Sequence, residues 1–96
     1  MKLEERIYNG NRAREVLENE VFQQVMTDLK AEITEKWQTS PARDEKGREW
    51  LWMLLSAAKK LEFMLQTTLD TGKLATADLE HQRTLAERAK AYLGME

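Results

Sequence analysis

The chain has 96 residues, enough for one hydrophobic core but too few for a core plus an elaborate enclosed active site. Hydrophobic residues make up 42% of it and charged residues 33%, a balance that is typical of helices with one buried face and argues against intrinsic disorder. The net charge of −2 gives no overall field that would draw the chain to nucleic acid or to an anionic membrane. Cysteine is absent, which excludes disulfides and thiolate metal sites.

The distribution of residue types predicts an all-α fold with a single domain, residues 1–96. The β-branched residues are scattered, and with four glycines and one proline no run resembles a strand. Charged residues from Lys2 onward interrupt any secretory pattern. The longest uncharged stretch of the apolar region, residues 50–58, is far shorter than the roughly 20 residues that span a bilayer. We therefore expect a cytoplasmic protein that does not enter the membrane.

The first ten residues are predicted to form an N-terminal arm. They include Leu3, Ile7 and Tyr8, and they end in the turn signal Asn9-Gly10-Asn11. This arm is expected to be flexible or to pack on the helices or on a neighbouring chain.

Residues 11–38 are predicted to form the first helix. At about 100° per residue, its apolar side chains fall within one arc of about 160°. Val16 and Leu17 miss this arc, so either the helix bends before Glu18 or its first turns contact something other than the intramolecular core. The predicted core stripe consists of Val21, Phe22, Val25, Met26, Leu29, Ile33 and Trp37.

The segment TSPARDEKG, residues 39–47, predicts a turn that leads into a second helix over residues 43–71. Ser40 is a possible cap before Pro41, and Asp44 is a competing cap. Gly72 suits the left-handed residue that follows a helix end, so a third helix is expected over residues 75–93. The predicted architecture is a small bundle of three helices with an antiparallel helical hairpin as its core, and we expect this bundle to form oligomers.

The central helix carries more apolar surface than one neighbour can cover. Its apolar side chains, with Trp50 among them as an expected core residue, span about 200°, while the alanine-rich helix 75–93 offers only a narrow stripe. Trp52 and Phe63 lie outside this arc, about 20° apart and about three turns distant along the axis. Exposed aromatic surface of this kind usually marks an interface. The predicted protein interface consists of Trp52, Phe63, Ser56, Lys59, Val16 and Leu17.

Signatures of catalysis are not found in the sequence. There is one histidine, and neither a glycine-rich phosphate loop nor a G-x-S-x-G motif occurs. The segment DLEH, Asp78 to His81, is better explained as a solvated helix surface than as a metal cluster, because no second histidine exists. Methionine at helical spacing commonly fills gaps in a core. We therefore expect no enzymatic activity, no catalytic residues, no cofactor and no metal site.

Nucleic-acid binding is possible from the sequence but is not favoured. Nearly every basic residue has an acidic residue within one helical turn, which lowers the local potential that phosphate binding needs. A solvated face of mixed charge explains the pattern better. The candidate nucleic-acid contacts are Arg43, Lys46, Arg48, Arg83 and Arg88.

Three segments in order, NRAREVLENEVF, WQTSPARDEKGREWLWMLL and TGKLATADLEHQR, carry a resemblance that covers residues 11–83. The chain resembles short helical proteins of unassigned function that are encoded by tailed bacteriophages. Its most distinctive part is the SPARD…GRE…LW segment. The resemblance implies a viral origin, presence in the bacterial cytoplasm or in the virion, and a role in virion assembly, DNA packaging or interference with host machinery. It assigns no functional residues.

The leading hypothesis from the sequence is a non-enzymatic helical module for protein-protein interaction and assembly that forms a homo-oligomer. One alternative is a phage DNA-packaging accessory that contacts nucleic acid, similar in general role to a small terminase subunit. Another is a small inhibitor of a host protein. The first and third hypotheses both require only an exposed apolar patch, so the sequence does not separate them.

Overall fold

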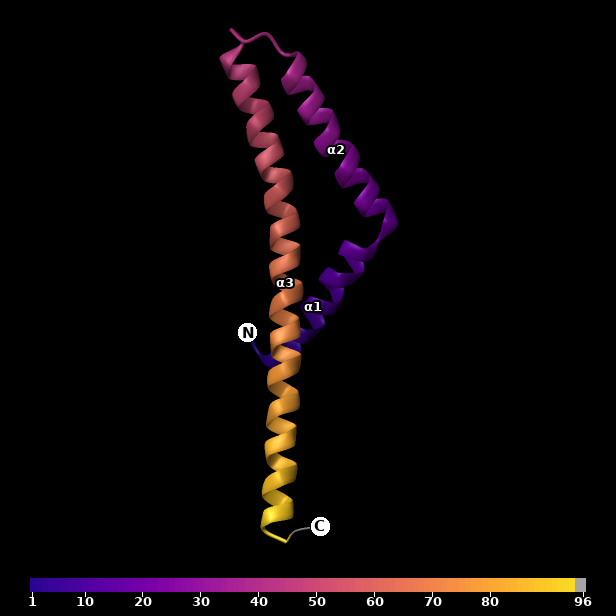
Figure 1. Ribbon diagram of the computed structural model, residues 1–96, viewed down its shortest axis with the longest axis vertical. Coiled ribbons are helices and arrows are strands. Elements are labelled where there is room, and N and C mark those ends of the chain that lie inside the picture. Colours follow the sequence, from indigo (N-terminus) through magenta and orange to yellow (C-terminus); the bar gives the residue numbers. More distant parts are fainter. Residues whose placement is uncertain (95–96) are drawn as a thin grey trace.

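The computed structural model describes residues 1–94, and that range contains three helices and no strand (Figure 1). They are α1 (Leu3–Glu18), α2 (Glu20–Thr39) and α3 (Glu45–Tyr92). The all-α prediction is therefore confirmed. Across residues 1–94, none of the helices combines the length and the apolar character that crossing a membrane requires.

Helix α2 and the first half of α3 form an antiparallel hairpin, and the turn at residues 40–44 connects them (Figure 1). Asp44 is the N-cap of α3, and its carboxylate accepts a hydrogen bond from the amide of Gly47 at 3.1 Å. Arg48 closes the turn by donating to the carbonyl oxygens of Trp37 and Ser40 and to the Ser40 hydroxyl. Its guanidinium also lies 4.0 Å from the centre of the Trp37 ring. The turn that the sequence predicts is present, with Asp44 rather than Ser40 as the cap.

Asn19 separates α1 from α2, so the single helix expected over residues 11–38 is wrong. Its backbone is extended, with ψ of 122°, and its side chain accepts a hydrogen bond from the amide of Phe22 at 2.9 Å. An asparagine side chain competes in this way with the helical backbone and starts a new helix. Gln23 reinforces the bend by donating from its side chain to the carbonyl of Leu17. The bend was one of the two explanations for Val16 and Leu17, and it falls just after Glu18.

Two glycines that resemble turn signals in the sequence instead form a contact between helices. Gly10 lies inside α1, so the turn predicted at Asn9-Gly10-Asn11 is wrong and residues 3–10 continue directly into the following helical turns, while Gly72 lies inside the unbroken α3. A Cβ added to Gly10 would lie 2.7 Å from the Cα of Gly72, and one added to Gly72 would lie 2.8 Å from the Cα of Gly10. Two helices can approach this closely only where neither has a side chain. The helices predicted over 43–71 and 75–93 are therefore one helix, because Gly72 serves the crossing and not a helix end.

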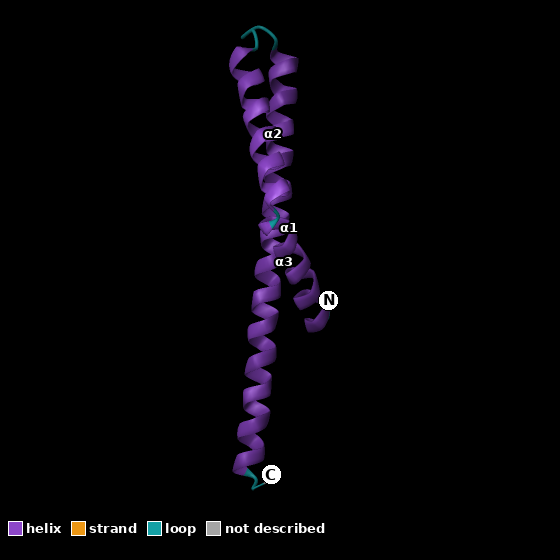
Figure 2. Cartoon of the chain, turned by 90° about the vertical axis from the view of Figure 1, so that its right-hand side faces the viewer, coloured by secondary structure: helices purple, strands orange, loops and turns teal. Residues whose placement is uncertain are grey.

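The molecule is extended, as Figures 1 and 2 show, and measures 77 × 25 × 16 Å. Its radius of gyration is 21.8 Å, whereas a compact chain of this length has about 12.5 Å. Beyond the crossing with α1, the remaining turns of α3 have no neighbouring helix within residues 1–94 (Figure 2). The buried apolar side chains within residues 1–94 are Ala13, Met26, Ile33, Ala58, Leu69 and Ala75.

Several residues predicted to lie in the core are exposed. Trp50 has 59% of its surface accessible, and in α2 only Met26 and Ile33 of the expected stripe are buried. The reason is that α3 contacts one side of α2 only, and in the described part of the chain no third helix covers the rest of the apolar arc. The exposed members of the predicted stripe are Val21, Val25, Leu29 and Trp37.

Candidate protein interface

A shallow apolar groove of about 210 Å³ lies on one side of the hairpin, close to its turn. Trp52, which the sequence places outside the core, lines this groove and has 64% of its surface exposed. The predicted interface residue is therefore accessible, and Trp37 from α2 adds a second aromatic ring. The groove is lined by Ile33, Thr34, Trp37, Leu51, Trp52 and Leu55.

Phe63 lies on the same line of α3 as Trp52 but further from the turn. The two side chains are about 16 Å apart along the helix axis, and Phe63 is 65% exposed. Ser56, which is half-buried, and the exposed Lys59 lie between them on this side of α3. These four predicted interface residues thus share one side of the helix, but only Trp52 lines the groove.

A second exposed apolar surface lies on another side of α3, and it consists of residues that the sequence predicts to lie in the core. Trp50 and Trp52 point about 160° apart around the helix. Between residues 50 and 64, α2 covers only the side of α3 that carries Leu55 and Ala58, because α1 crosses lower down, near Gly72. We call this surface the Trp50 face, and it consists of Trp50, Met53, Leu54, Ala57, Leu61 and Met64.

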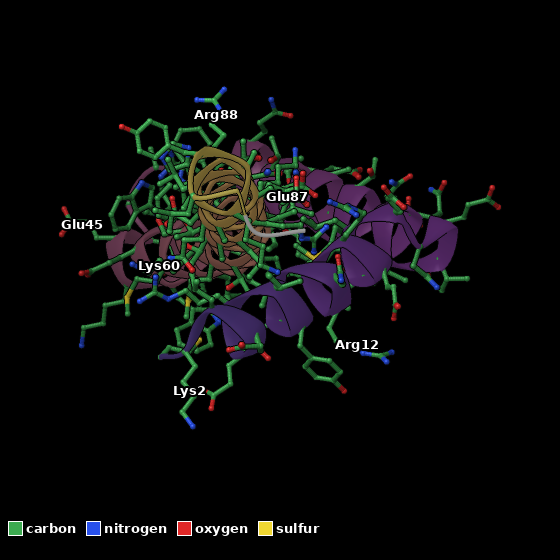
Figure 3. All side chains as sticks on the ribbon, turned by 90° about the horizontal axis from the view of Figure 1, so that it is seen from below. Lys2, Arg12, Glu45, Lys60, Glu87 and Arg88 are labelled. Atoms are coloured by element: carbon green, nitrogen blue, oxygen red, sulfur yellow. The ribbon has the colours of Figure 1, made fainter. Side chains whose placement is uncertain are left out.

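The Trp50 face lies on the side of α3 against which α1 packs, nearer to the hairpin turn. Figure 3 looks along α3 and shows α2 on one side of it, Lys60 on the opposite side and α1 in a third direction. Five large side chains of the face are 37% to 59% exposed. The width of the apolar arc was the signal for this surface in the sequence, since an arc of about 200° exceeds what one helix covers.

Val16 and Leu17, the remaining predicted interface residues, lie at the end of α1 beside the bend at Asn19. Val16 is 39% exposed and Leu17 is half-buried. Their carbonyl oxygens accept hydrogen bonds from the Asn19 amide and the Gln23 side chain. This bend is at the opposite end of α2 from the hairpin turn (Figure 1), so the structure does not bring these two residues together with Trp52.

The five candidate nucleic-acid contacts do not form one patch. Arg43, Lys46 and Arg48 lie at the hairpin turn, whereas Arg83 and Arg88 lie about 50 Å or more further along α3. Arg48 is half-buried and its guanidinium is engaged with Trp37 and Ser40. The structure therefore separates these residues into two groups. In the group at the hairpin turn, Arg48 has a structural role because it holds the turn together.

Polar chemistry on the described surface is sparse. Within residues 1–94, no three metal-ligating side chains lie close enough together to hold an ion. The interaction with the Tyr8 side chain, and then the charge of Glu15, raise the pKa of Arg12, whose side chain is exposed on α1. The two apolar surfaces of the hairpin are therefore the main candidates for binding another protein. Comparisons with protein-family models, curated proteins and solved structures gave no match.

Proposed function

We propose that this chain is a helical module for protein-protein interaction and assembly, encoded by a tailed bacteriophage, that forms a homo-oligomer. The observation that supports this is the accessible surface, which amounts to 7957 Å². A compact monomer of 11.2 kDa would expose about 5,700 Å², so the chain exposes an excess of about 2,300 Å². One partner in a standard interface contributes about 800 Å². The excess is therefore sufficient for at least one stable interface.

The chemical nature of that surface also favours assembly. Trp37, Trp50 and Trp52 are all exposed by 42% or more. Contiguous apolar patches larger than a few hundred Å² mark interaction sites, and buried tryptophan contributes strongly to binding energy. The mechanism of the protein is accordingly the burial of these side chains against another protein surface.

The phage context rests on the resemblance of residues 11–83 to short phage proteins, and it makes virion assembly the setting for the proposed oligomer. Direct contact with DNA has less support, because the candidate basic residues lie in two separate groups and Arg48 has intramolecular partners. Inhibition of a host protein would use the same apolar surfaces, and the oligomeric state separates it from self-assembly.

The test is the solution mass of the full chain, measured by light scattering across a dilution series. Self-assembly predicts a mass that is a multiple of 11.2 kDa and falls on dilution. The same series for Trp52→Ala shows whether the groove contributes, with Gln82→Ala on the uncovered end of α3 as the control. A monomeric wild-type chain at every concentration contradicts the proposal.

A further inference from the structure

We propose that two copies of the chain pair through the Trp50 face, with their α3 helices antiparallel around a two-fold axis between Leu54 and Ala57. This inference rests on the proposed self-assembly. It specifies which of the two apolar surfaces forms the primary interface and how the copies are oriented.

The spacing of the exposed residues is that of a helix-pairing seam. Along the Trp50 face, apolar residues alternate at intervals of four and three, the pattern by which two helices pack side by side. A second seam with the same spacing begins one residue later, at Leu51, and faces α2 and then α1; it is apolar except for Glu62, which pairs with Lys30 of α2. Helix α3 thus carries two parallel seams, of which only the second has an intramolecular partner between residues 50 and 64. The exposed seam consists of Trp50, Leu54, Ala57, Leu61 and Met64.

The exposed seam is self-complementary when it is paired in the antiparallel direction. Each Trp50 then lies opposite Leu61 of the second copy, and each Leu54 lies opposite Ala57. Small alanines at the centre permit a close approach, while the large rings fill the two outer layers. An interface of this kind uses the same patch on both copies and closes on itself as a dimer.

Charges at the margin of the seam select the antiparallel orientation. Glu49 directly precedes Trp50, and Lys60 directly precedes Leu61 on the same margin. In the antiparallel pair, each Glu49 lies within about 3 Å, measured along the axis, of Lys60 in the second copy. In a parallel pair this margin would lie on opposite sides of the seam in the two copies, so Glu49 and Lys60 would not meet. Within residues 1–94 neither side chain has an ion-pair partner, and Figure 3 shows Lys60 projecting from α3 away from α2.

The proposed pairing also fits the position of α1. With the axis between Leu54 and Ala57, α3 of the second copy would begin at the level of Gln66. Contacts with α1 lie just beyond this level, since Thr67 and Thr68 line a pocket with Arg6 and Asn9 of α1 and a Cβ on Gly10 would lie 3.3 Å from the carbonyl oxygen of Thr68. The second copy and α1 therefore cover successive parts of the same side of α3. The uncovered ends of the two α3 helices would project in opposite directions.

Charge reversal at the margin tests the orientation, with the dimer dissociation constant measured by sedimentation equilibrium on the full chain. Glu49→Lys and Lys60→Glu should each weaken the dimer about tenfold, because two attractive contacts become repulsive. The double variant should return the constant to within about twofold of the wild type. Lys59→Glu is the matched control, since Lys59 lies on the side of α3 that carries Trp52, and it should change the constant less than about twofold.

Circular dichroism should show unchanged helix content in all four variants, because the substituted side chains are exposed. If neither single reversal changes the dimer dissociation constant, or if the double variant does not restore it, the antiparallel pairing is overturned but the proposed self-assembly remains intact. An oligomer that dissociates on Trp52→Ala but not on Leu61→Ala also overturns the antiparallel pairing, because this result would place the interface at the groove and not at the Trp50 face. A monomer at every concentration overturns both proposals.

Discussion

Two regions of the molecule differ in the size of their side chains. They are the crossing of α1 over α3, which is built from small residues, and the hairpin of α2 and α3, which carries large ones. At the crossing, Gly10, Ala13, Gly72 and Ala75 are buried, and the helices approach until backbone nearly touches backbone. In the hairpin, large side chains such as Trp50 and Trp52 remain exposed. The small residues thus pack within one chain, whereas many of the large apolar side chains remain exposed and available to a partner. This contrast is the physical basis for separating residues that stabilise the monomer from residues that bind a partner.

The largest expected effect compares two leucines on α3. Leu69 is 8% exposed and Leu61 is 48% exposed. Leu69→Ala should lower the free energy of unfolding by about 2–4 kcal/mol through lost burial and an unfilled cavity. Leu61→Ala should cost the monomer less than about 1 kcal/mol but should weaken self-association. Urea denaturation at a concentration where the chain is monomeric measures both values, and equal costs would contradict the distinction between the two regions.

The next effect concerns the crossing itself. Gly72→Leu should lower the free energy of unfolding by about 1–3 kcal/mol, because the new side chain meets the backbone of α1 and forces the helices apart. Ala77→Leu, at an exposed position of the same helix, is the control and should change stability by less than about 0.5 kcal/mol. Thermal unfolding followed by circular dichroism gives the comparison. A stable Gly72→Leu variant would mean that α1 does not pack at this crossing in solution.

The bend between α1 and α2 should respond more weakly. Asn19→Ala removes the acceptor for the Phe22 amide and should cost about 1 kcal/mol, as is usual for the loss of an N-cap. Asn11→Ala, at an exposed position inside α1, should instead be neutral or slightly stabilising because alanine favours helix. Chemical denaturation of the two variants side by side distinguishes a cap from an ordinary surface asparagine.

The smallest effect is expected for the ion pair between Lys30 and Glu62, which links α2 to α3 at 2.9 Å. Both side chains are about one third exposed, so Glu62→Gln should cost less than about 1 kcal/mol. The loss should shrink further in high salt. A much larger loss at any ionic strength would mean that this contact, and not the apolar seam beginning at Leu51, holds the hairpin together.

Local signals in the sequence predicted the helical class and the hairpin turn, because the Asp44 cap and Pro41 act through their immediate neighbours. They failed at Gly10 and Gly72, because a glycine that ends a helix and one that permits a close crossing have the same local appearance. Only the contact between α1 and α3, which the sequence does not display, decides between these roles. The only sign of the break at Asn19 in the sequence is that Val16 and Leu17 lie outside the apolar arc of the predicted helix.

The candidate interface was predictable in part for a related reason. Periodicity identifies which sides of a helix are apolar, and it placed Trp52 and Phe63 outside the core, where both are exposed. Periodicity does not count how many helices are available to cover an apolar arc. Trp50 was therefore assigned to the core, although α2 covers only the neighbouring seam and α1 lies further along the helix.

Small-angle X-ray scattering of the wild-type chain tests most directly whether a second copy covers the Trp50 face. An antiparallel pair centred between Leu54 and Ala57 would extend about 110 Å from one end of α3 to the other, since each helix projects about 55 Å from the axis. The single chain measures 77 Å. We predict a particle of twice the chain mass with a maximum dimension near the larger value. A particle of 11.2 kDa that extends no further than the single chain would contradict the pairing and leave the exposed tryptophans without a partner.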